Sequence, residues 1–66
     1  MDESMINSNI AELESQLDYA EYMFNKQNDL FNKGLGTELE TKTAENQVNS
    51  LSAKLKTLKV QKSKMR

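Results

Sequence analysis

The stretch Lys33–Glu40, with the sequence KGLGTELE, holds both glycines of the 66-residue chain and separates two long helix-forming runs. Gly34 suits the left-handed residue that closes a helix, and Leu35 is placed to fold back onto the last turn. Thr37 and Glu40 have the spacing of a capping box, in which each side chain satisfies a backbone N–H of the other residue. The stretch therefore predicts a helix that ends near Lys33, a turn at Gly34, Leu35 and Gly36, and a second helix from Thr37.

The sequence on both sides of this turn repeats with the period of a coiled coil. Apolar and small residues recur in alternating steps of four and three, a spacing that strands do not show. The seam before the turn consists of Ile6, Ile10, Leu13, Leu17, Ala20, Phe24, Gln27 and Phe31. The seam after the turn consists of Thr37, Thr41, Ala44, Val48, Leu51, Leu55, Leu58, Lys62 and Met65.

Folding the chain about the turn brings the two seams into one register. Large residues then meet small ones near the tip, and aliphatic layers are expected to be strongest in the middle of the hairpin. We expect an all-α fold, a two-helix antiparallel coiled-coil hairpin over residues 1–66, with helices at about 4–33 and 37–65 and a turn at 34–36. The expected pairs are Phe31 with Thr37, Gln27 with Thr41, Phe24 with Ala44, Ala20 with Val48, Leu17 with Leu51, Leu13 with Leu55, Ile10 with Leu58, and Ile6 with Lys62.

The composition indicates that this hairpin needs a further source of stability. Only 36% of the residues are hydrophobic, and at this size burial roughly cancels conformational entropy. There is no cysteine for a disulfide, and no cysteine or histidine for a structural zinc. We therefore expect either a fragment of a larger protein or self-association, for example as a four-helix bundle.

Charge is distributed unevenly, although the formal net charge is only −1. In a hairpin, the acidic start of the chain lies beside its basic end, and each complements its own helix dipole. An internal acidic partner for the basic end argues against nucleic-acid binding. The acids of the first 21 residues are Asp2, Glu3, Glu12, Glu14, Asp18 and Glu21, and the bases of the last 14 are Lys54, Lys56, Lys59, Lys62, Lys64 and Arg66.

No group of residues in the sequence predicts catalysis, a metal site or a cofactor. The pairs Glu12/Glu14 and Glu38/Glu40 are two residues apart, so each pair points to nearly opposite sides of a helix. Without histidine or cysteine, transition-metal and thiol chemistry are not expected. No apolar run is long enough to span a bilayer. We expect a protein that is not an enzyme.

Apolar residues outside the seam point to contacts with other chains. Tyr19, Met23 and Leu30 share one flank of the first helix, with Lys26 among them. Leu39, Ala53 and Val60 share the outer face of the second helix. Single exposed apolar residues are common on proteins, but repeated ones on one flank favour packing against a partner.

The tip also resembles a known family. Lys26, Leu30 and Thr37 have the spacing of the Arg–Leu–Ser/Thr motif at the hairpin tip of periplasmic adaptor proteins, the membrane fusion proteins of tripartite efflux pumps and type I secretion systems. The run from Asn28 to Val48 is similar to their turn and returning helix, and the likeness covers about residues 10–60. Lysine at position 26 departs from the family's arginine and cannot offer its planar fork.

This resemblance implies a docking function. It implies that the tip contacts the periplasmic end of an outer-membrane channel, that neighbouring hairpins assemble side by side, and that the parent protein is anchored at the inner membrane. Lys26 would be a polar contact, Leu30 an apolar contact, and Thr37 both a contact and the helix cap. Two alternatives remain open: a cytoplasmic coiled coil that homodimerises through its flanks, and a lysine-rich arm whose binding to RNA or lipid falls steeply with salt.

Overall fold

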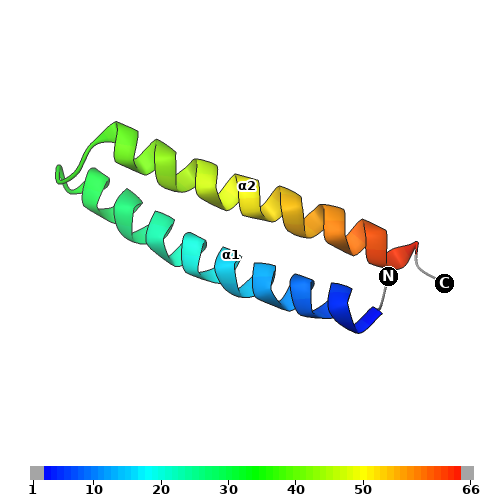
Figure 1. Cartoon of the computed structure of the whole chain (residues 1–66). Helices are drawn as coiled ribbons and strands as arrows, with labels where there is room; N and C mark the ends of the chain where they lie inside the picture. Colours follow the sequence, from blue (N-terminus) through cyan, green and yellow to red (C-terminus); the bar gives the residue numbers. More distant parts are fainter. Residues whose placement is uncertain (1–2, 65–66) are drawn as a thin grey trace.

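The computed structural model describes residues 3–64 and contains two helices, α1 (Glu3–Asn32) and α2 (Glu38–Ser63). The helices run antiparallel along their whole length and are joined by one short connection (Figure 1). The molecule is a rod of 51 × 14 × 12 Å. The expected all-α helical hairpin is confirmed. We call the end that carries the connection the tip, and the end where α1 begins and α2 finishes the open end.

The helix boundaries lie within two residues of the expected ones. Helix α1 ends at Asn32, one residue before the predicted end, because Lys33 already belongs to the closing turn. Helix α2 begins at Glu38 with Thr37 as its N-cap, and it ends at Ser63 with Lys64 as its C-cap. The sequence predicted an end at about residue 65, which lies outside the described residues. The residues that lie outside the described part of the chain are Met1, Asp2, Met65 and Arg66. The sequence predictions that name them are therefore left open.

The two seams line the contact between the helices. Ile6, Ile10, Ala20, Leu51 and Leu55 are buried, at 1% to 9% exposure. Among residues 3–64, every position of intermediate exposure lies on a seam, apart from Glu45. These half-buried seam residues are Leu13, Leu17, Phe24, Gln27, Thr41, Ala44, Val48 and Leu58.

Burial is deepest toward the open end, whereas the sequence placed the strongest aliphatic layers in the middle. Ile6, Ile10 and Leu55 form the buried cluster, and Leu13, Leu17 and Leu58 pack against it. Ile6, expected opposite Lys62, is the most deeply buried side chain of the cluster, at 1% exposure. Toward the tip, the polar Gln27 and Thr41 and the small Ala44 stand in the seam in place of aliphatic residues. The large Phe31 of the last layer is still 39% exposed. The tip half is therefore held more weakly than the half with aliphatic layers on both helices.

Among residues 3–64, the acidic and basic ends meet at one ion pair between the helices. The Lys59 Nζ atom lies 3.6 Å from Glu14 Oε2, and both side chains are more than half exposed. A pair in such a position contributes at most about 1 kcal/mol, because water and salt screen it. The apolar seam therefore supplies most of the stability.

The hairpin exposes more surface than a compact protein of its mass. Its accessible surface is 5131 Å², whereas a compact monomer of 7.6 kDa is expected to expose roughly 4,300 Å². The excess follows from the rod shape, in which each helix has only one neighbour. Much of it is apolar, since Tyr19, Tyr22, Leu35 and Leu39 are all more than half exposed. Such a surface favours burial against other chains.

Candidate functional site

The end of α1 is closed by a hydrogen-bond pattern that depends on one glycine. Gly34 has a φ of 80°, which is left-handed, and its N–H donates to the Phe31 carbonyl at 3.0 Å. The N–H of Leu35 donates to the Leu30 carbonyl at 2.8 Å. These two bonds form a Schellman motif, as the Gly34-Leu35 sequence predicts. Because the Leu30 carbonyl is held by this motif, the position of Leu30 is fixed by the turn itself.

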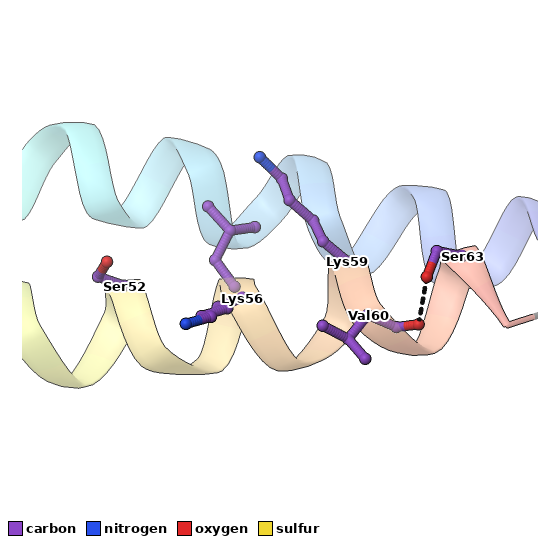
Figure 2. A pocket seen from close by; sticks show the side chains of 6 residues that line it. Ser52, Lys56, Lys59, Val60 and Ser63 are labelled. Carbon is purple, nitrogen blue, oxygen red and sulfur yellow. Dashed lines mark hydrogen bonds between the residues drawn. The ribbon is translucent and has the colours of Figure 1, made fainter.

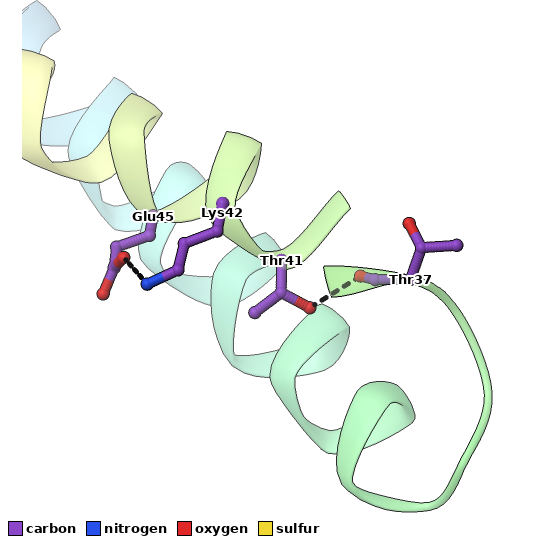
Figure 3. A network of polar contacts seen from close by, with 4 residues as sticks. All are labelled: Thr37, Thr41, Lys42 and Glu45. Carbon is purple, nitrogen blue, oxygen red and sulfur yellow. Dashed lines mark hydrogen bonds and ion pairs between the residues drawn. The ribbon is translucent and has the colours of Figure 1, made fainter. Parts of the chain in front are cut away.

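The start of α2 is closed by the predicted capping box. Thr37 has extended backbone angles, and the Glu40 N–H donates to Thr37 Oγ1 at 3.1 Å. In return, Glu40 Oε1 accepts from the Thr37 N–H at 2.9 Å and from the Thr37 hydroxyl at 3.0 Å. The Thr37 carbonyl also accepts from the Thr41 hydroxyl at 3.2 Å, which Figure 3 shows. The two closures together leave only residues 33–37 to reverse the chain.

The capping box limits what Thr37 can offer to a partner. Its hydroxyl has one hydrogen and two lone pairs. The hydrogen is donated to Glu40 Oε1, and one lone pair accepts from the Glu40 N–H. One lone pair is left, so a partner that binds this hydroxyl while the cap stays intact has to donate a hydrogen bond.

Removing this cap should lower stability by a modest, measurable amount. We expect Thr37→Ala to cost about 1 kcal/mol, since the early N–H groups of α2 lose their side-chain acceptor. Denaturant unfolding followed by circular dichroism measures the difference. Thr37→Ser keeps the hydroxyl and should stay within a few tenths of a kcal/mol of the wild type. Equal stability of the alanine variant and the wild type would show that the capping box contributes nothing.

The three residues of the tip motif are all exposed, Lys26 and Leu30 in the last two turns of α1 and Thr37 as the N-cap of α2. Lys26 and Leu30 lie one turn apart on α1, and Leu30 is 42% exposed. The Lys26 Nζ atom lies 5.6 Å from the centre of the Tyr22 ring, a cation–π contact at a solvated site. Thr37 is bonded to Glu40 and not to either of the other two. The motif residues therefore present separate contacts on one end of the rod.

One contact at the tip was missed by the sequence reasoning. Tyr22 supports Lys26, and its position one turn before the lysine is the signal that could have revealed the contact. Near the connection, Leu35 and Leu39 are also exposed, at 57% and 75%. Leu35 was predicted to fold back onto the last turn and Leu39 to face outward. The tip as a whole is thus more apolar than the motif alone implies.

Gly36 completes the turn and has a φ of 83°. A Cβ atom at this residue would lie 2.7 Å from Nε2 of Gln27, the half-buried polar member of the α1 seam. At Gly34, by contrast, an added Cβ would meet nothing within 4 Å. The loop therefore approaches the end of the seam closely at Gly36 and is open at Gly34.

The described part of the chain was also searched for metal sites, membrane spans and cavities. Between residues 3 and 64, no group of three or more Asp, Glu, His or Cys side chains could hold a metal ion. Neither helix, as far as it is described, is long and apolar enough to cross a membrane. The hollows on the described surface are open grooves between and beside the helices.

No protein-family model, curated protein or solved structure matches this chain. The functional argument therefore depends on the residues of the tip and on their arrangement.

Proposed function

We propose that the chain is the docking hairpin of a bacterial periplasmic adaptor, and that its tip binds the periplasmic end of an outer-membrane channel of an efflux or secretion system. It acts without catalysis, as a structural element of transport. Its parent protein is anchored at the inner membrane and places the hairpin in the periplasm. Neighbouring hairpins of the same kind stand beside it in the assembled adaptor.

The observation that carries this proposal is the exposure of an apolar residue at the closed end of the rod. Leu30 is 42% exposed, and its carbonyl is fixed by the Schellman motif that ends α1. A leucine whose backbone is already ordered costs no further backbone entropy when a partner covers its side chain. The motif spacing of Lys26, Leu30 and Thr37, shared with the adaptor family, supports the same assignment.

Each motif residue then has a separate task. Leu30 is buried between helices of the channel and supplies most of the affinity. Lys26 donates to a carbonyl or carboxylate of the channel as a point charge, without the two parallel bonds of an arginine. Thr37 accepts a hydrogen bond through its remaining lone pair. The channel therefore presents an acceptor to Lys26 and a donor to Thr37.

The test is a binding experiment with a matched control. The probe is the outer-membrane channel encoded beside the gene of the parent protein, purified in detergent and passed over the immobilised hairpin. We expect Leu30→Asp to lower the affinity at least about tenfold, because a carboxylate cannot be buried in the apolar contact. Helicity should not change, because Leu30 is not part of the buried cluster.

Val60→Asp serves as the control for this substitution. Val60 is 45% exposed, close to the value of Leu30, but it lies near the open end, far from the tip. Its replacement should leave channel binding unchanged. Equal retention of the channel by the wild type and by Leu30→Asp would refute the docking assignment, and so would an equal loss in both variants.

A second candidate is a coiled-coil module whose only role is to form homo-oligomers. The apolar flank of Tyr19 and Met23, at 65% and 45% exposure, favours it together with the large surface of the rod. This candidate predicts self-association without any affinity for a channel. The binding experiment above therefore separates the two.

A further inference from the structure

The tip half of α1 carries a second apolar stripe beside the seam. Tyr19, Met23, Lys26 and Leu30 follow steps of four, three and four, and each directly precedes a seam residue. Their apolar members are exposed, at 65%, 45% and 42%. Residues with this spacing form a continuous stripe, along which the helix of another chain can pack. We call these four residues the ridge.

The opposite flank of the same half is hollow. A groove of about 370 Å³ runs between the helices, with Phe24 and Phe31 in it and Asn28, Glu38, Lys42 and Glu45 around it. Lys42 Nζ lies 3.5 Å from Glu45 Oε1, and Figure 3 shows this pair on one side of α2. The polar residues named here each directly follow a seam residue, so the groove and the ridge lie on opposite flanks.

We propose that the ridge of one copy packs into the groove of a second copy, with the two hairpins parallel and their tips level. The proposal rests on the part of the proposed function in which neighbouring hairpins stand side by side, and it names the surfaces that meet. Because the two surfaces lie on opposite flanks, one neighbour cannot use both. The contact is therefore heterologous, and repeating it yields a closed ring or an open row.

Charge selects this pairing over the symmetric one. Lys26 lies in the middle of the ridge, and Glu38 lies at the groove without an ion pair among the described contacts. A ridge in a groove brings Lys26 near the acids of the neighbour. Two ridges packed against each other in antiparallel fashion would instead bring both Lys26 side chains to the centre of the contact. Like charges facing each other there destabilise such a dimer.

The positions of the ridge and the groove along the rod favour the parallel arrangement. Met23 precedes Phe24 and Leu30 precedes Phe31, so the ridge and the groove occupy the same part of the rod. When the tips of two parallel copies are level, the ridge of one copy lies beside the groove of the other. The open ends of the two copies then also lie together. Antiparallel copies would overlap only in their tip halves. The parallel contact therefore covers more of the excess surface of the rod, as a stable interface of more than about 1,000 Å² requires.

The test uses cross-linking, for which the chain is well suited because it contains no cysteine. Gln16 precedes the seam residue Leu17, and Ser52 follows the seam residue Leu51, its partner in the expected register. The two residues thus lie at one height, on the ridge flank and the groove flank. Both are exposed, and neither belongs to the ridge, the groove or the tip motif. Figure 2 shows Ser52 on α2, one helical turn before Lys56.

Chains of all 66 residues carrying Gln16→Cys or Ser52→Cys are mixed and treated with a short bismaleimide, and the masses of the products are measured by mass spectrometry. We expect the mixed product to exceed either homodimer severalfold. A majority of Gln16→Cys homodimer would overturn the proposal in favour of ridge-to-ridge contact. Absence of any cross-linked pair, with a monomeric mass in solution, would overturn it together with the side-by-side assembly, while leaving channel docking to its own test.

A second measurement changes the ridge itself. Met23→Glu should weaken self-association at least about tenfold in sedimentation equilibrium, because a carboxylate cannot enter a groove that already holds two acids. Val60→Glu is the control, because Val60 has the same 45% exposure but belongs to neither the ridge nor the groove. Its replacement should leave self-association unchanged. Helicity should be unchanged in both variants. Unchanged association of Met23→Glu would overturn the assignment of the ridge.

Discussion

Leu55→Ala should remove most of the stability of the isolated hairpin. Leu55 is 8% exposed and belongs to the buried cluster with Ile6 and Ile10. Truncating a buried leucine costs about 2–5 kcal/mol through lost transfer energy and the cavity that remains. A chain of this length is stable by roughly 3–10 kcal/mol in total. The variant should therefore unfold at a much lower temperature, with part of its helicity lost already at 25 °C.

The measurement is thermal and urea unfolding by circular dichroism at several chain concentrations, since self-association adds to the stability of the folded form. Leu39→Ala is the control, because Leu39 is 75% exposed and its truncation should change stability by no more than about 0.5 kcal/mol. Equal unfolding curves for the two alanine variants would mean that the cluster at the open end does not hold the helices together.

The sequence predicts the fold well because its local and long-range signals agree. The capping box of Thr37 and Glu40 and the left-handed Gly34 are local patterns, and both are present in the structure. The seams add a period that needs no knowledge of the partner helix. The fold class could therefore be predicted in full, and the helix ends within two residues.

The distribution of burial could not be predicted in the same way. Pairing along the seam places Ile6 opposite Lys62, which suggests a weak layer, yet Ile6 is the most buried residue of the cluster. Burial depends on all neighbours of a side chain, including those one turn above and below, whereas the pairing scheme considers one partner. The groove with Phe24 and Phe31 was missed for the same reason, because it arises where facing seam residues are too small to fill the space.

The candidate site could likewise be predicted only in part from the sequence. The spacing of Lys26, Leu30 and Thr37 can be read from the sequence, but the hydrogen bonds that commit the Thr37 hydroxyl to Glu40 depend on the folded turn. The contact between Lys26 and Tyr22 depends on side-chain conformation as well as on spacing. Sequence reasoning thus names the residues at the tip, whereas the structure defines which contacts they have left for a partner.

Gly36→Ala is expected to have the second large effect on the isolated chain, through the geometry of the reversal. Gly36 has a φ of 83°, and an L-residue in this region costs about 1–2 kcal/mol. In addition, the new Cβ atom would lie 2.7 Å from Gln27 Nε2, so the half-buried amide has to move. We expect a loss of about 1–2 kcal/mol from the backbone alone, and a larger loss once the displacement of Gln27 is included.

Gly34→Ala separates the cost of the left-handed backbone from the cost of displacing Gln27. Its φ of 80° gives nearly the same backbone cost, but its Cβ would meet no atom within 4 Å. Urea unfolding should therefore rank the wild type above Gly34→Ala, and Gly34→Ala above Gly36→Ala. A chain synthesised with D-alanine at position 36 avoids the backbone cost, because D-residues favour positive φ, and should be more stable than the L-alanine form. Equal stability of the L- and D-alanine forms would show that the reversal does not depend on a left-handed residue at this position.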